Sequence, residues 1–173
     1  YIDRYVREEL QDFQNRNDRF RHLFLRLRST AFAIIDQVAE EMRHSDFVPL
    51  EFELSFGDGG DLPAVVISEP DVELRVGGKV DRVDGWVKDG KLYLRVVDYK
   101  SGRKAFDLSA VKMGLDIQML LYLFALAHGG TDILGKNPYP AGVQYFPARA
   151  PVVAADGALS DEEAKKLRIK EWK

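Results

Sequence analysis

The chain contains no cysteine among its 173 residues, and this absence removes several classes of site at once. Disulfides, zinc–thiolate centres and iron–sulfur ligation within this stretch are excluded, because each requires cysteine sulfur. Long apolar runs are also missing, so we expect no membrane-spanning segment. There is no secretory leader pattern and no initial methionine. We therefore expect a fragment of a larger cytoplasmic protein.

A strong excess of charge is missing as well: 25 Lys and Arg against 28 Asp and Glu give a net charge of −3. Any binding of nucleic acid must therefore come from local basic patches. The three histidines are scattered, and the signatures of serine hydrolases, zinc proteases and P-loop nucleotide binders are absent. With 46% hydrophobic residues, we expect one folded domain over 1–173, with a helical part at 1–45 and a core of sheet and helices at 46–173.

Residues 78–102 carry the most informative pattern in the chain. Asp89-Gly90 predicts a two-residue hairpin turn, because a type I′ turn requires positive φ at both central positions. With this loop, one hairpin face is apolar and ends in Asp81 opposite Asp98. The other face carries three pairs, Trp86–Tyr93, Asp84–Arg95 and Arg82–Val97. A register shifted by one residue would scramble both faces, so the pattern favours this pairing.

The opposed acids Asp81 and Asp98 are costly without a cation. Like charges facing each other destabilise a ladder, and desolvation at the end of a buried face disfavours ionisation. Lys100 shares their face, since side chains i and i+2 point the same way. Two carboxylates with a backbone carbonyl suit Mg²⁺ or Mn²⁺, which activate water for attack on a phosphodiester. The alternative is that these are ordinary strand-end acids beside a solvated lysine.

The rest of the chain predicts an α/β fold in which a mixed β-sheet is flanked by helices. Hydrophobic periodicity and capping patterns predict helices at 2–15, 18–44, 107–113 and 115–128 and from Ser160 onward. Alternation and short apolar runs predict strands at 50–56, 65–67, 72–76 and 141–146.

Three further polar residues are candidates for the same site. Gln118 and Tyr122 are the polar exceptions in the apolar helix and share a face at i and i+4. Either both side chains reach the carboxylate end of the hairpin, or Gln118 is a buried, satisfied core glutamine and Tyr122 has its hydroxyl at the rim of the core. Glu53 lies with Glu51 on one face of the first strand and is a candidate third metal ligand. The alternative for Glu53 is the polar face of a half-exposed strand.

Three blocks in this order resemble the PD-(D/E)xK nuclease superfamily, and within it the RecB-like nucleases. They are residues 78–84 (GKVDRVD), 96–102 (VVDYKSG) and 114–122 (GLDIQMLLY). Together with residues 49–57 (PLEFELSFG), they look most like the C-terminal nuclease domain of the AddB family. That family supplies a subunit of bacterial ATP-dependent helicase–nucleases that process double-strand breaks. The resemblance covers residues 20–173.

The resemblance implies a restriction-endonuclease-like fold and Mg²⁺- or Mn²⁺-dependent DNA hydrolysis, as an exonuclease rather than an endonuclease, beside an AddA-like helicase partner. The metal ligands it implies are Asp81, Asp98, the carbonyl of Tyr99 and Glu53. It makes Lys100 the catalytic lysine and Gln118 and Tyr122 its supporting residues. Asp84 also matches the family pattern, but its pairing with Arg95 on the far face indicates a structural role.

Two features depart from the family pattern. The cysteines that hold an iron–sulfur cluster in AddB-like domains are absent, so a cluster in the full-length protein would have its ligands outside this stretch. The glycine–histidine motif of an early helix is also absent. Two alternatives to a nuclease therefore remain. One is a degenerate, inactive nuclease fold that binds DNA or assists assembly, and the other is a scaffold that docks a helicase.

Overall fold

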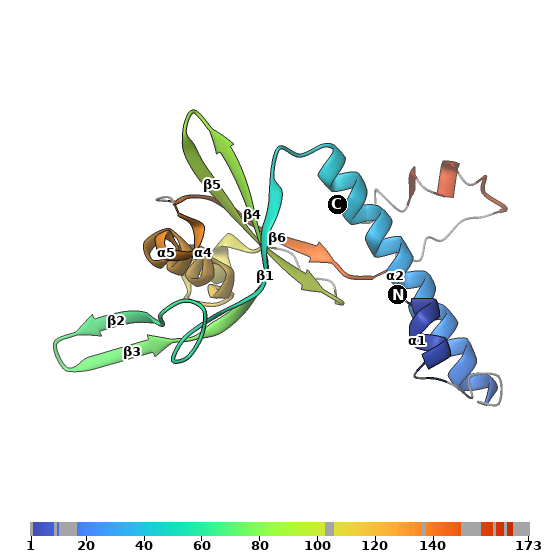
Figure 1. Cartoon of the computed structure of the whole chain (residues 1–173), viewed down its shortest axis with the longest axis horizontal. Helices are drawn as coiled ribbons and strands as arrows, with labels where there is room; N and C mark the ends of the chain where they lie inside the picture. The colour runs from blue at the N-terminus through green and yellow to red at the C-terminus, as the bar shows by residue number, and fades with distance from the viewer. Residues whose placement is uncertain are drawn as a thin grey trace. The chain divides into compact units, whose positions relative to one another are not determined.

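The structure is a computed structural model that describes residues 2–8, 10, 17–102, 106–135, 138–149, 157–160, 162–164 and 166–167 (Figure 1). It divides into two compact units: Tyr1–Glu41 with Ala148–Lys173, and Met42–Pro147. The organisation of the whole chain as a single domain stays a prediction. Among the described residues, no helix is both long and apolar enough to cross a membrane.

The first unit is helical. Helix α1 (Ile2–Glu8) matches the start of the helix predicted at 2–15, of which residues 9 and 11–16 lie outside the described part. Helix α2 (Asp18–Arg43) confirms the prediction for 18–44, and Asn17 caps it by accepting the N–H of Phe20 at 2.8 Å. The capping box predicted at Ser160 is confirmed, since Ser160 and Glu163 exchange backbone-to-side-chain hydrogen bonds at 3.0 and 3.3 Å.

The second unit is built on a mixed four-stranded sheet, as predicted. Its order is β1 (Val48–Phe56), β4 (Gly78–Lys88), β5 (Lys91–Lys100) and β6 (Pro138–Pro147). The first two pairings are antiparallel and the third, between β5 and β6, is parallel. Strands β2 (Val65–Glu69) and β3 (Val72–Val76) form a separate antiparallel hairpin (Figure 1).

The register predicted for the central hairpin is confirmed for every pair except Asp81–Asp98, which lies beyond the end of the ladder. Strands β4 and β5 pair from Lys88–Lys91 at the loop to Arg82–Val97. Asp89 has φ 49° and Gly90 has φ 74°, which are the two positive values that a type I′ turn requires. The hairpin therefore keeps its apolar and polar faces separate along its length.

Helix α4 (Gln118–Gly129) covers the apolar face of the sheet and packs against β5 and β6. The buried side chains of α4 pack with those of the strands in one hydrophobic core. The apolar sequence of the helix fits this buried position. Leu92, Leu94 and Val96 of β5 belong to this core and are 5%, 0% and 0% exposed. Two short helices, α3 (Leu108–Lys112) and α5 (Thr131–Leu134), flank α4, and Asp107 caps α3.

Several predicted boundaries differ from the structure. The helix predicted at 115–128 begins at Gln118, because Gly114 and Asp116 have left-handed backbones with φ 76° and 53°. Strand β6 is longer than the predicted 141–146. The alternation predicted for β1 is interrupted by an irregular register after Pro49 and by a left-handed residue at Glu53, with φ 55°. Strand β1 consequently buries its C-terminal end and leaves Phe52 62% exposed.

Candidate active site

The candidate site lies where strands β4 and β5 stop pairing with each other. Their ladder ends at Arg82–Val97, whereas β4 continues along β1 as far as Gly78 and β5 continues along β6 as far as Lys100. Continuing the register by one residue places Asp81 opposite Asp98. In place of a ladder bond, the backbone N–H of Tyr99 donates to Oδ2 of Asp81 at 2.8 Å.

Asp98 and Lys100 form an ion pair at the site. Nζ of Lys100 lies 2.7 Å from Oδ2 of Asp98, and the Asp98 residue is only 8% exposed. The close contact with the Asp98 carboxylate raises the pKa of the Lys100 ammonium above its ordinary value, although partial burial opposes it, and the charge of Asp81 acts in the same direction as that of Asp98. Lys100 is therefore a fixed cation at neutral pH. It can stabilise negative charge, and it cannot accept a proton there.

Glu53 lies at the same level of the sheet as Asp81, but its carboxylate pairs with Lys79. Phe52 pairs with Arg82 and Leu54 with Val80, so Glu53 lies opposite Asp81 across β1 and β4. Its carboxylate is 2.5 Å from Nζ of Lys79, and this hydrogen bond raises the pKa of Lys79. The assignment of Glu53 as a metal ligand stays a prediction.

The donor set fits a hard divalent cation held largely by water. Among the described residues, no three His, Cys, Asp or Glu side chains gather closely enough to hold one ion. Mg²⁺ commonly uses only one or two carboxylates and keeps several water ligands, so a site based on Asp81 and Asp98 needs no third acid. The backbone of Tyr99 connects the two, because it follows Asp98 in the chain and hydrogen-bonds Asp81. The ligand roles of all three residues stay predictions.

Gln118 and Tyr122 form the i, i+4 pair that their spacing indicates. Nε2 of Gln118 donates to Oη of Tyr122 at 2.5 Å. The expectation that Gln118 is buried is wrong: it is exposed because α4 begins there, after the left-handed Asp116. Tyr122 is 5% exposed and lies against the start of β4, where a Cβ on Gly78 would come within 2.9 Å of its hydroxyl. Tyr122 thus touches the strand that carries Asp81, and the support of the chemistry by Gln118 and Tyr122 stays a prediction.

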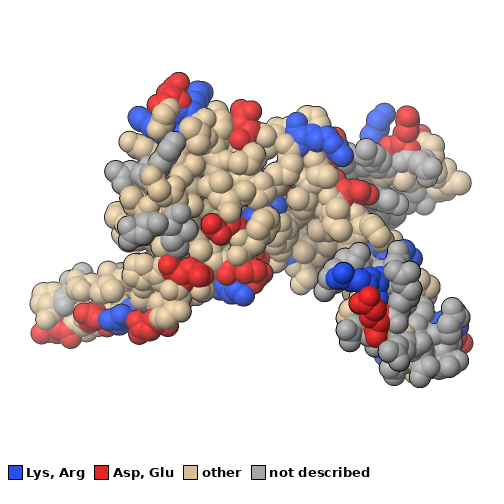
Figure 2. Space-filling view, in the orientation of Figure 1, with Lys and Arg blue, Asp and Glu red and all other residues tan. Residues whose placement is uncertain are grey.

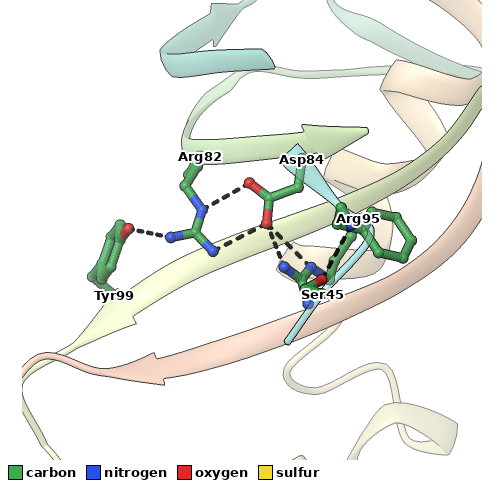
Figure 3. Close-up of polar contacts among 6 residues, drawn as sticks. Ser45, Arg82, Asp84, Arg95 and Tyr99 are labelled. Carbon is green, nitrogen blue, oxygen red and sulfur yellow. Dashed lines mark hydrogen bonds and ion pairs between the residues drawn. The ribbon is translucent and has the colours of Figure 1, made fainter. Parts of the chain in front are cut away.

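A buried ionic network occupies the opposite face of the hairpin (Figure 3). Asp84, fully buried, accepts from Nη2 and Nε of Arg95 at 2.7 and 3.1 Å, as the predicted pair requires. Arg82, 1% exposed, contacts Asp84 through Nε at 2.8 Å and Nη2 at 3.0 Å, and its Nη1 donates to Oη of Tyr99 at 2.7 Å.

The links from Arg82 to Asp84 and Tyr99 were missed from the sequence, where Arg82 was considered only as the partner of Val97. One signal was available. Residues 82 and 84 share a strand face, and residue 99 lies two places beyond the cross-strand partner of residue 82.

Charge on the molecular surface is mixed. On the face drawn in Figure 2, the coloured Lys and Arg side chains lie among Asp and Glu side chains and form no single broad patch. This agrees with the near-neutral composition. Attraction of a polyanion to the described part of this face would therefore be local.

Comparison with known proteins places the chain in a family. The family model described as the PD-(D/E)XK nuclease superfamily matches residues 1–173. Among curated proteins, the chain is 40% identical over 156 residues to the B subunit of the ATP-dependent helicase/deoxyribonuclease of Caldanaerobacter subterraneus subsp. tengcongensis, covering 89% of the chain and 13% of that protein. The protein of the same name from Acetivibrio thermocellus is 37% identical over 154 residues, covering 88% of the chain and 13% of that protein.

A further relative extends the match to nearly the whole chain. The protein of the same name from Clostridium perfringens is 32% identical over 173 residues, or 99% of the chain and 15% of that protein. The chain thus spans about one seventh of the length of the relatives it matches. Because the family model matches from the first residue to the last, this chain belongs to the PD-(D/E)XK nuclease superfamily.

Proposed function

We propose that the chain is a metal-dependent DNA nuclease domain that hydrolyses phosphodiester bonds within a helicase–nuclease for double-strand-break repair. The observation that carries this proposal is the Asp98–Lys100 ion pair, which lies beside Asp81 where β4 and β5 part. A fixed ammonium beside two carboxylates at a strand opening is suited to phosphoryl chemistry. The names of the relatives support deoxyribonuclease activity within an ATP-dependent helicase complex.

Asp81, Asp98 and the carbonyl of Tyr99 would hold Mg²⁺ or Mn²⁺. When bound, such a cation activates water and neutralises charge on the phosphoryl group. The N–H of Tyr99 orients Asp81, and the Lys100 ammonium stabilises the negative charge that develops on the phosphate oxygens. Tyr122 would support the start of β4 from α4, where it lies against Gly78, and Gln118 would hold the Tyr122 hydroxyl.

The whole protein would act together with a helicase. No P-loop pattern occurs in this sequence, so the motor would lie elsewhere in the polypeptide or on an AddA-like partner. We propose DNA as the substrate, cleavage from an end as the DNA is unwound, and the cytoplasm as the compartment. An iron–sulfur cluster in the full-length protein would take its cysteines from outside these residues, since this chain has none.

The test is cleavage of end-labelled linear duplex and of covalently closed circular DNA, each with and without Mg²⁺ or Mn²⁺. We expect the metal to be required, the linear substrate to be degraded, and Asp98→Ala and Lys100→Ala to abolish cleavage while circular dichroism shows a retained fold. Asp71→Ala, which removes an exposed acid in the turn between β2 and β3, is the control and should remain active. Cleavage that survives both site substitutions would refute the proposal.

A second candidate is an inactive nuclease fold that binds DNA or helps assembly. The pairing of Glu53 with Lys79 favours it, because that pairing leaves fewer free acids near Asp81. Calorimetry with Mn²⁺ separates the two functions. Mn²⁺ binding that disappears in Asp98→Ala supports the nuclease, whereas an intact fold that binds DNA and no Mn²⁺ supports the inactive module.

A further inference from the structure

The two faces of the central hairpin meet at one residue, Tyr99. Its backbone N–H reaches the candidate site by donating to Oδ2 of Asp81 at 2.8 Å. Its phenol points the other way, and Oη accepts from Nη1 of Arg82 at 2.7 Å (Figure 3). Tyr99 therefore connects the buried ionic network to the acid that lies opposite Asp98.

The anchor at the phenol end is rigid. Arg82 lies within ion-pair distance of both carboxylate oxygens of Asp84, with Nε 2.8 Å from Oδ1 and Nη2 donating a hydrogen bond to Oδ2 at 3.0 Å. Arg82 is 1% exposed and Asp84 is fully buried, so water cannot replace these contacts. Arg95 supplies a second cation to Asp84, 2.7 Å from Oδ2. The third nitrogen of Arg82, Nη1, is thus held at a set position facing Tyr99.

The phenol ring is restrained by more than this one bond. It makes an edge contact with Phe146 of β6, with ring centroids 5.4 Å apart. Residue 99 is also paired with Phe146 through the backbone ladder. The hydroxyl of Tyr99, its ring and the side of its backbone that pairs with β6 are all fixed. The backbone N–H of Tyr99 therefore has little freedom to move. It faces the Asp81 carboxylate where the β4–β5 ladder no longer constrains Asp81.

We infer that Arg82, oriented by Asp84, is a positioning residue: it fixes Tyr99 and, through the Tyr99 N–H, holds the Asp81 carboxylate where a cation shared with Asp98 requires it. The inference rests on the proposed function and adds a role for the buried network. Arg82 and Asp84 touch neither substrate nor cation. They act only through the backbone of Tyr99.

Tyr99→Phe is the sharpest perturbation, because it removes one hydroxyl and keeps the ring on Phe146. Tyr93→Phe is the matched control, because Tyr93 lies on the same strand and face, six residues before Tyr99, with its ring tilted against those of Trp86 and Tyr139. We expect the Mn²⁺ dissociation constant of Tyr99→Phe, measured by calorimetry, to rise about tenfold, the low end of the range for losing a group that helps to orient a metal ligand. By the same measurement, the Mn²⁺ dissociation constant of Tyr93→Phe should change by less than about twofold.

Two further readouts separate positioning from general damage. In metal-free protein, hydrogen exchange of the amide at position 99 should accelerate in Tyr99→Phe toward the rate seen in Asp81→Ala. In cleavage assays, the half-maximal Mn²⁺ concentration should rise by the same factor of about ten, whereas the rate at saturating Mn²⁺ should stay near that of the wild type. Arg82→Lys, which keeps the charge but loses the planar fork, should reproduce both effects in weaker form.

The outcomes are distinct. If the wild type binds Mn²⁺ and cleaves DNA, and Tyr99→Phe matches it in affinity and amide exchange, the inference is wrong and the nuclease stands. If the wild type neither binds Mn²⁺ nor cleaves, the proposed function is wrong. The amide exchange then decides alone whether Arg82 positions Asp81 through Tyr99. Faster exchange only in Tyr99→Phe and Arg82→Lys, with Tyr93→Phe unchanged, supports the inference.

Discussion

Gly78, the first residue of β4, leaves room for the Tyr122 side chain, and adding one methyl group there tests how tightly the two are packed. A Cβ at Gly78 would lie 2.9 Å from both Cε1 and Oη of Tyr122 and 3.1 Å from Cζ of Phe56. Tyr122 is 5% exposed and its ring stands edge-on to that of Phe56, with centroids 5.0 Å apart, so neither ring has free space to move into. Overpacking of this kind costs about 1–3 kcal/mol.

We therefore expect Gly78→Ala to lower the free energy of unfolding by about 1–3 kcal/mol in urea denaturation. Gly142→Ala is the matched control. It lies in β6 of the same sheet, where a Cβ meets nothing within 4 Å, and removing backbone freedom there should leave stability unchanged or raise it by up to about 1 kcal/mol. Equal effects of the two substitutions would refute the packing of Tyr122 on Gly78. If the packing also supports the site, cleavage should fall in Gly78→Ala and persist in Gly142→Ala.

Two other substitutions test a buried carboxylate, Asp84, and an exposed one, Asp61. Asp84→Ala leaves two arginines without their shared, fully buried carboxylate, so it should lower the free energy of unfolding by about 3–5 kcal/mol in denaturant titration, and a loss below about 1 kcal/mol would contradict the network. Ser55→Ala should raise the pKa of Asp61, followed by carboxyl NMR, because the Ser55 hydroxyl holds it below its ordinary value. Since that pKa is lowered in the folded state, the stability difference from wild type should be present above the ordinary pKa of an aspartate and vanish as the pH falls. A difference that grows in acid would contradict this assignment.

The features predicted correctly from the sequence are those set by neighbours close in the chain. The Asp89-Gly90 turn fixes the β4–β5 register, and the register determines which side chains share each face of the hairpin. Helix α2 follows from its apolar periodicity, and the capping box at Ser160 follows from a spacing of three residues.

What the sequence did not reveal depends on backbone conformations and distant contacts. The left-handed residue Asp116 delays the start of α4, so Gln118 is exposed instead of buried. The left-handed Glu53 disturbs β1 in the same way and leaves its carboxylate beside Lys79. The contact from Arg82 to Tyr99 runs diagonally across two strands, and only the three-dimensional arrangement distinguishes it from the simpler pairing of Arg82 with Val97.

Anomalous diffraction from crystals soaked in Mn²⁺ tests the central claim most directly. We predict one peak between the carboxylates of Asp81 and Asp98, lost when Asp98→Ala crystals are soaked in the same way. A saturating soak that leaves no peak between these carboxylates, with Lys100 still paired to Asp98, would contradict the claim that the parted ends of β4 and β5 form a cation site.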